Sequence, residues 1–153
     1  MTGFWQTVLA WLPHKTIKGE CVAQRGPLMD RWFIFRSPVC SLMVHRFNRS
    51  DADRHFHDHP WAFITFLMSS GYWEHTPKGR FWRRQFSVLY RPATWQHWVE
   101  LNNGQKTWTL VLKFRTVREW GFITSGGWVY WRDLDFEPIC NEYASTQHLA
   151  GGA

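Results

Sequence analysis

The feature that most constrains the fold is a series of short strand-like runs separated by turn residues. Beyond residue 30, apolar and β-branched residues occur in short runs, and turn pairs such as Asn103-Gly104 and Gly126-Gly127 interrupt them. Helical periodicity is nearly absent after residue 13. About nine or ten strands at near-regular spacing are typical of a β-sandwich or β-barrel. The sequence therefore predicts an all-β fold.

The predicted elements divide the chain into three parts. Residues 1–30 hold a short amphipathic helix over 3–12, which Pro13 ends, and a lead-in strand. Residues 31–137 form the barrel, and residues 138–153 form a C-terminal tail with little to bury. The expected strands of the barrel are 31–36, 41–47, 54–59, 61–68, 72–76, 81–91, 98–101, 108–115 and 128–132.

Length and composition limit the class of protein. A chain of 153 residues suits one domain, and no apolar run is long enough to span a membrane. The three cysteines, Cys21, Cys40 and Cys140, form no CxxC pair and indicate neither a disulfide framework nor a cysteine-bound zinc. The apolar N-terminus lacks the basic region and the cleavage site of a signal peptide. We expect a cytoplasmic protein with no export signal and no membrane anchor.

Positive charge and aromatic residues occur together in two segments, 80–84 and 113–118. The formal net charge of +6 favours anionic partners, and alternating basic and aromatic side chains can bind single-stranded nucleic acid. The same alternation is more typical of a strand with one solvated face, which we favour, so nucleic acid is permitted but not indicated. Most of the 12 tryptophans are expected to be core residues.

The segment that carries chemistry is a run of three histidines at a spacing of two, His55, His57 and His59. In an extended strand these side chains share a face at intervals of about 6.5 to 7 Å, and an His-x-His pair can bind one metal ion. A further ligand must come from another strand. His97 lies about 40 residues downstream in a separate strand-turn-strand segment, and a closed barrel would bring it opposite the first pair.

These two segments resemble the two motifs of the cupin superfamily, whose fold is the jelly roll or double-stranded β-helix. His57-x-His59 precedes Gly71 at the interval of the first motif, and Pro92 and His97 occupy their places in the second. The family's glutamate ligand is absent, because Phe63 or Ile64 stands there. The chain is also similar to small cupins of bacteria and their phages that carry a His-Pro-Trp segment.

The resemblance implies a metal site of three histidines, His57, His59 and His97, as in cysteine dioxygenase and related three-histidine iron dioxygenases. Three neutral imidazoles leave a divalent ion with its full charge and open positions, which suits Fe(II), while zinc, nickel and manganese are alternatives. We therefore expect a non-haem iron oxygenase that acts on a small, anionic molecule.

Supporting residues can be named around this site. Glu74 is a candidate replacement ligand or proton acceptor, and the alternative is a rim carboxylate paired with an arginine. His55 is a candidate for the edge of the site, and Tyr90 a candidate for the pocket lining. Asp58 is expected to face away from the ion and to orient a neighbour. Arg83 or Arg91 is a candidate clamp for a substrate carboxylate or phosphate.

Two other functions are kept open. A metal-independent sugar isomerase or epimerase of the same fold would use a histidine as its base and would resist a chelator. A non-enzymatic module that binds a ligand or a protein would depend on the aromatic, basic surface instead. Pairing of two copies into a homodimer is also expected.

Overall fold

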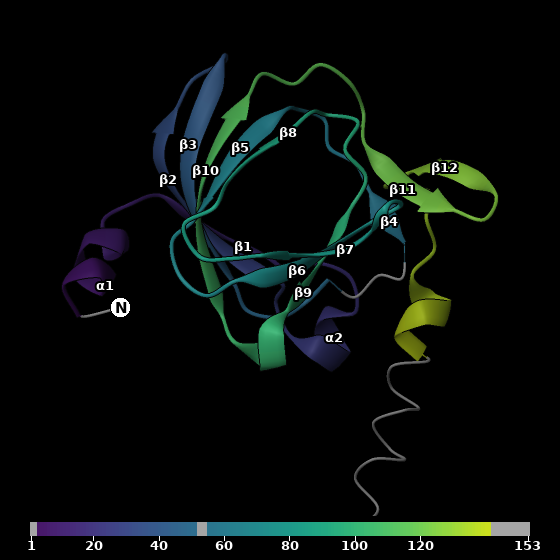
Figure 1. Cartoon of the computed structure of the whole chain (residues 1–153), viewed down its shortest axis with the longest axis horizontal. Coiled ribbons are helices and arrows are strands. Elements are labelled where there is room, and N and C mark those ends of the chain that lie inside the picture. Colours follow the sequence, from purple (N-terminus) through teal and green to yellow (C-terminus); the bar gives the residue numbers. More distant parts are fainter. Residues whose placement is uncertain (1–2, 52–54, 142–153) are drawn as a thin grey trace, which may run out of the picture.

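The computed structural model describes residues 3–51 and 55–141. The chain folds into an all-β barrel with only short helices, as the sequence predicts, and Figure 1 looks into the barrel from one end. The described helical and strand elements are α1 (Gly3–Ala10), β1 (His14–Ile17), α2 (Val22–Arg25), β2 (Met29–Arg36), β3 (Cys40–Phe47), β4 (Phe56–His57), β5 (Phe63–Leu67), β6 (Tyr72–Thr76), β7 (Gly79–Arg83), β8 (Val88–Arg91), β9 (Trp98–Leu101), a 3-10 turn (Asn102–Gly104), β10 (Thr107–Phe114), β11 (Gly121–Thr124) and β12 (Gly127–Tyr130).

One wall of the barrel is an antiparallel sheet of six strands in the order β1-β2-β3-β10-β5-β8. Strands β7, β6 and β9 form a second sheet on the opposite side, as Figure 1 shows, and β12, β11 and β4 form a third at one end. Most neighbours are far apart in the sequence, since β10 lies between β3 and β5. Such crossings between sheets are how a jelly roll closes its barrel.

Alternation along the strands places the core inside the barrel. In β5, Phe63, Thr65 and Leu67 are buried while Ile64 and Phe66 lie on the outer side. The buried apolar residues form two clusters, one of Leu67, Tyr72, Val99 and Leu101 and one of Met43, Phe63 and Val111. The second cluster lies beside the histidines, because the rings of Phe63 and His59 are 4.7 Å apart.

Some predicted elements differ in detail. The expected strand over 81–91 is two strands, β7 and β8, which are separated by a turn with Phe86 at positive φ. Strands β1 and β11 are formed by segments that lack a clear strand pattern, and their partners β2 and β12 supply the backbone hydrogen bonds. The helix expected over 3–12 is α1, Gly3–Ala10, and Leu9 on it is buried. Of the expected tail, residues 142–153 lie outside the described residues.

The cysteines behave differently from the expectation. The sequence predicted no disulfide, and that prediction is wrong, because Cys21 and Cys140 are joined by one across 119 residues. The spacing of the cysteines carried no sign of this, since the pairing depends on how the helical turn at 137–141 packs on the barrel. Phe136, just before that turn, packs against Phe122 of β11. The cytoplasmic location stays a prediction, and among the described helices none is long enough to cross a membrane.

Candidate metal centre

Three histidines from two distant segments meet at the end of the barrel. His57 ends β4, His59 follows two residues later, and His97 precedes β9. The backbones of His57 and His97 exchange both N–H···O hydrogen bonds at 3.0 Å, and the His59 N–H donates to the carbonyl of Ala93. Backbone pairing therefore fixes the three side chains relative to one another before any ion binds.

The ligand atoms of His57, His59 and His97 all lie within 4.8 Å of one another. The Nε2 atoms of His59 and His97 are 2.9 Å apart. Two imidazole nitrogens bound to one ion at about 2.1 Å and at right angles lie about 3 Å apart, so this spacing fits a shared metal ion. The expected set of three histidines is thus brought together in the described part of the chain.

A buried carboxylate sets the tautomer of His97. Glu74 on β6 has no exposed surface, and its Oε1 lies 2.9 Å from Nδ1 of His97. Burial by itself raises the pKa of Glu74, but hydrogen bonds from His97 and Arg91 bring it well below its usual range. Because the carboxylate is ionised, Nδ1–H of His97 is the donor in this hydrogen bond, and Nε2 is the ring nitrogen that faces the other histidines. Carboxylate–histidine pairs of this kind orient metal ligands.

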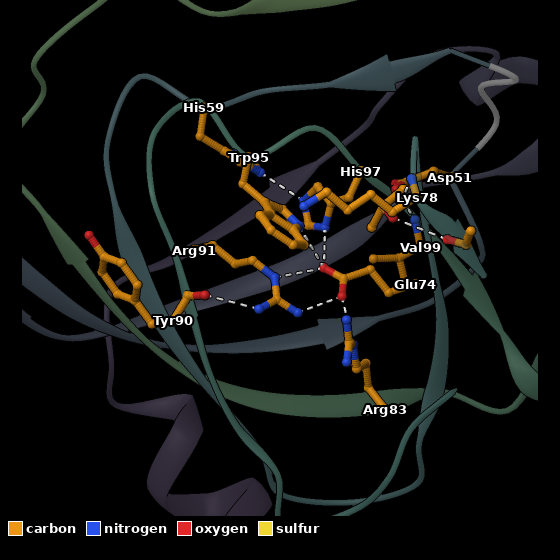
Figure 2. A network of polar contacts seen from close by, with 12 residues as sticks. Asp51, His59, Glu74, Lys78, Arg83, Tyr90, Arg91, Trp95, His97 and Val99 are labelled. Carbon is orange, nitrogen blue, oxygen red and sulfur yellow. Dashed lines mark hydrogen bonds and ion pairs between the residues drawn. The ribbon is translucent and has the colours of Figure 1, made fainter. Parts of the chain in front are cut away.

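Glu74 also gathers three further donors, as Figure 2 shows. Arg91 donates to both carboxylate oxygens, Arg83 donates to Oε2 at 2.7 Å, and the Trp95 indole donates to Oε1 at 3.1 Å. Glu74 therefore lies behind His97 and is not itself in the cluster of ligand atoms. Arg83 and Arg91, the candidate clamps for a substrate anion, both bind this carboxylate instead.

The pKa values of two of the histidines favour neutral rings. Burial is the largest cause and lowers the pKa of His57 to about 4. The charge of Asp51 raises this pKa, and His97 lowers it. Burial also lowers the pKa of His59 well below its usual value, and the neighbouring basic groups His97, His57 and Arg31 lower it further. Both rings are uncharged at neutral pH, so each offers a lone pair to a cation. The donor set and its spacing fit a divalent metal.

The three histidines open into a cavity of about 420 Å³ inside the barrel. Its walls are mostly apolar or aromatic, with Met43, Phe63 and Trp61 beside the histidines. Polar groups reach it from the six-stranded sheet, where Arg31, His45 and Thr109 face one another across β2, β3 and β10. The hydroxyl of Thr109 is buried without a partner among the described residues. A cavity of this size and lining suits a small molecule.

Asp58 fixes the strands that cap this end. It is 2% exposed, and it accepts hydrogen bonds from the Arg118 guanidinium, the Gly121 N–H and the Trp128 indole. These contacts hold β11 and β12 against β4 and keep Trp120 over the cavity, where its ring lies 6.3 Å from that of His57. Asp58 lies outside the metal cluster and positions its neighbours.

The other predicted residues lie elsewhere. His55 belongs neither to the cluster of ligand atoms nor to the residues that line the cavity. Tyr90 on β8 is 59% exposed. Its backbone carbonyl accepts a hydrogen bond from Arg91, as Figure 2 shows. The cavity residues Arg31 and His45 were not predicted. Their signal is alternation, because both occupy inward positions of strands that are otherwise apolar on that side.

A comparison with protein-family models finds none that matches the sequence, and a comparison with curated proteins finds none either. Solved structures are similar. A cupin 2 conserved barrel domain protein from Rhodopseudomonas palustris has a TM-score of 0.60 and 11% identity, over 76% of this chain and 81% of that one.

Two others carry a named activity or metal. A sugar phosphate isomerase from a cupin superfamily, from Silicibacter pomeroyi, has a TM-score of 0.56 and 10% identity over 80% of this chain and 88% of that one. The structure of FeII HppE has a TM-score of 0.54 and 9% identity over 69% of this chain and 57% of that one. At these identities the likeness shows the fold alone, and it confirms the one predicted from the two histidine segments: the chain has the cupin fold, a double-stranded β-helix.

Proposed function

We propose that this protein is a metal-dependent enzyme, an oxygenase that holds Fe(II) on His57, His59 and His97 and acts on a small anionic molecule. The observation that carries the proposal is the geometry of three imidazoles around one point at the wall of a cavity inside the barrel. A structural zinc site has four protein ligands as a rule. Among the described residues no carboxylate or thiol joins the three histidines as a fourth ligand.

A bound ion would supply a Lewis acid with open positions for a substrate and a small co-reactant. The chain's own residues do the rest. His97 is oriented so that Nε2 faces the ion, because the Glu74 carboxylate accepts a hydrogen bond from Nδ1–H. The aromatic side chains of the cavity wall, Trp61 and Trp120 among them, would limit the access of water to the reacting groups. Similarity in fold to FeII HppE is compatible with iron but does not identify it.

The experiment is a measurement of bound metal. Protein purified without added metal, then supplied with Fe(II) under anaerobic conditions, should bind about one equivalent. His57→Ala, His59→Ala and His97→Ala should each bind less than about a tenth of that. His75→Ala is the matched control, because His75 stacks on Trp98 and bonds Glu100 outside the cluster. Wild-type protein that binds no more metal than the three variants would refute the site, and anomalous scattering would identify the ion.

An isomerase or epimerase that needs no metal is the second candidate, and one residue favours it. Glu20 lines the same cavity, and burial raises its pKa above the usual value, which suits a general base. Activity on a sugar that survives a chelator and the three histidine variants, but is lost in Glu20→Gln, would support this function. A binding module without catalysis predicts ligand binding with no turnover.

A further inference from the structure

A second cavity of about 510 Å³ adjoins the cavity of the three histidines. The two share Lys15, Arg31, Met43 and Trp61 in their walls. The second cavity also contains Arg36 and Lys113, and we call it the basic pocket after its four cationic side chains, Lys15, Arg31, Arg36 and Lys113. None of the residues that line it is Asp or Glu. The basic pocket therefore offers concentrated positive charge next to the candidate metal centre.

Strand register gathers these four side chains on one face of the six-stranded sheet. Lys15 on β1 lies opposite Arg31 on β2, and Lys113 on β10 lies opposite the inward-facing Ser41 on β3. Arg36 would point to the outer face if β2 alternated regularly after Arg31. A bulge between Phe33 and Phe35 shifts the register, so Arg36 also pairs with Ser41 and turns inward. An irregularity in the strand thus adds the fourth cation.

The guanidinium of Arg31 has no acidic partner in the part of the chain that the structure describes. Its Nε donates to Nε2 of His45 at 2.9 Å, and within the described residues this is its one hydrogen bond. His45 is an uncharged acceptor, because burial and the nearby Arg31 lower its pKa well below the usual value. The contact orients the guanidinium without neutralising it and leaves both Nη groups available to a ligand. Burial also lowers the pKa of Arg31 to about 10.

Like charges crowd the pocket as well. Burial lowers the pKa of Lys113, and the positive charges of Arg31 and Arg36 lower it further. Lys113 lies over the ring of Trp61 at 4.8 Å and Arg36 over the ring of Phe33 at 4.5 Å, and neither side chain has an ion pair with a described residue. Elsewhere in the barrel the inward arginines are paired with carboxylates, as Arg91 is with Glu74. Lys15 and Arg36 are exposed and Lys113 is half-buried, so solvent screens their charges, whereas Arg31 is the cation whose burial a bound anion would offset most.

Trp61 connects the pocket to the metal centre. Lys113 lies over one side of its ring, and the ring centroid of His59 is 5.9 Å from that of Trp61. Arg31 is also near enough to His59 for its charge to lower the pKa of that histidine. An anionic group seated in the basic pocket therefore lies one aromatic ring away from the reacting end of the cavity.

We propose that the basic pocket binds the phosphate group of a phosphorylated small molecule whose other end reaches the three histidines. A phosphate carries about two negative charges and three acceptor oxygens, which matches several separate cationic donors better than the single charge of a carboxylate does. This inference rests on the proposed function for the identity of the reacting end, but binding of the phosphate depends on the pocket alone.

Inorganic phosphate is the probe. Calorimetric titration of the full chain should show one phosphate site, weakened about ten-fold or more in Arg31→Met and in Lys113→Met, because each removes a charge-assisted hydrogen bond. Arg115→Met and Lys106→Met remove the same charges from exposed positions outside the pocket and should leave the affinity unchanged. Circular dichroism verifies that each variant is folded, and Lys113→Met, at the end of β10, tests the pocket if Arg31→Met does not fold.

Two results would overturn the inference. Equal losses in the control variants would mean that phosphate responds to net charge alone, and succinate binding as tightly as phosphate would mean that the pocket does not select a phosphate. The metal measurement above separates the two proposals. Phosphate binding that persists in His59→Ala supports the phosphate site even if no metal binds. Bound metal without a phosphate site would overturn this inference and leave the proposed function unaffected.

Discussion

Replacing Glu74 by Gln tests whether one buried carboxylate supports both the barrel and the histidine cluster. The oxygens of Glu74 accept from His97, Trp95, Arg83 and Arg91 at once. A glutamine has one oxygen and one NH₂ group in the same space. If the oxygen stays at the position that serves His97, the NH₂ group faces the donors of Arg83 and Arg91, and these two cations lose the carboxylate with which they pair.

The size of the effect follows from burial. Glu74 is 0% exposed, and the side chain of Arg91 is 8% exposed, so solvent can replace little of the lost interaction. Removing one partner of a buried ion pair costs about 3 to 5 kcal/mol. For a chain of this length that is a fall in Tm of about 6 to 20 °C. Metal binding should weaken by about 10- to 100-fold as well, because a neutral amide oxygen replaces the ionised carboxylate that orients His97.

Thermal and urea unfolding, with a metal-competition titration, measure both effects. Glu100→Gln is the matched control, since Glu100 pairs with His75 and Arg80 on the same sheet but its side chain is 34% exposed. That exposed network should contribute less than about 1 kcal/mol, and its loss should leave metal affinity unchanged. A Glu74→Gln protein no less stable than Glu100→Gln, with wild-type metal affinity, would refute the reasoning.

Three further predictions concern pH, the cap and the disulfide. In metal-free protein the pKa of His57 is about 4 in the folded state and about 6.5 in the unfolded state, so the unfolded chain binds a proton first as pH falls. The free energy of unfolding should therefore decrease as pH falls from 6.5 to 4. Denaturant titrations at a series of pH values measure this decrease. Asp58→Ala removes the acceptor of three hydrogen bonds and should lower the free energy of unfolding by about 1 to 3 kcal/mol. Amide exchange at 121–130, measured by mass spectrometry, should become faster. Cys21→Ser should lower the free energy of unfolding by about 2 to 5 kcal/mol only without reductant, and a thiol assay of the folded wild type should detect Cys40 alone.

The barrel could be predicted from local periodicity, and the histidine cluster from the resemblance of two segments to the cupin motifs. Alternation predicts which residues face inward, and the spacing of His57 and His59 survives any small error in strand ends. The role of Glu74 was not predictable in the same way. It follows from the pairing of β6 with β9, which sets Glu74 opposite Val99 and near His97, and turn geometry rather than sequence pattern decides that pairing.

The partners of the inward arginines could not be predicted from the sequence either. Arg91 and Arg31 both lie on inward positions, and sequence alone does not tell which one meets a carboxylate. The structure gives the carboxylate to Arg91 and Arg83, which leaves Arg31 beside a neutral histidine. The position of Arg36 depends on a bulge that breaks the very alternation from which a prediction would be made.

The candidate metal centre also lies at a seam between the sheets of the barrel. The backbones of His57 and His97 join the third sheet to the segment before β9, and Asp58 ties β11 to the same point. Glu74, from the second sheet, bonds the side chain of His97 from behind. An ion held by His57, His59 and His97 would therefore add three bonds where segments far apart in the sequence already meet. Because an unfolded chain does not hold the three imidazoles together, the free energy of metal binding would add to the stability of the closed barrel, and substitutions at the seam would alter stability and metal affinity together.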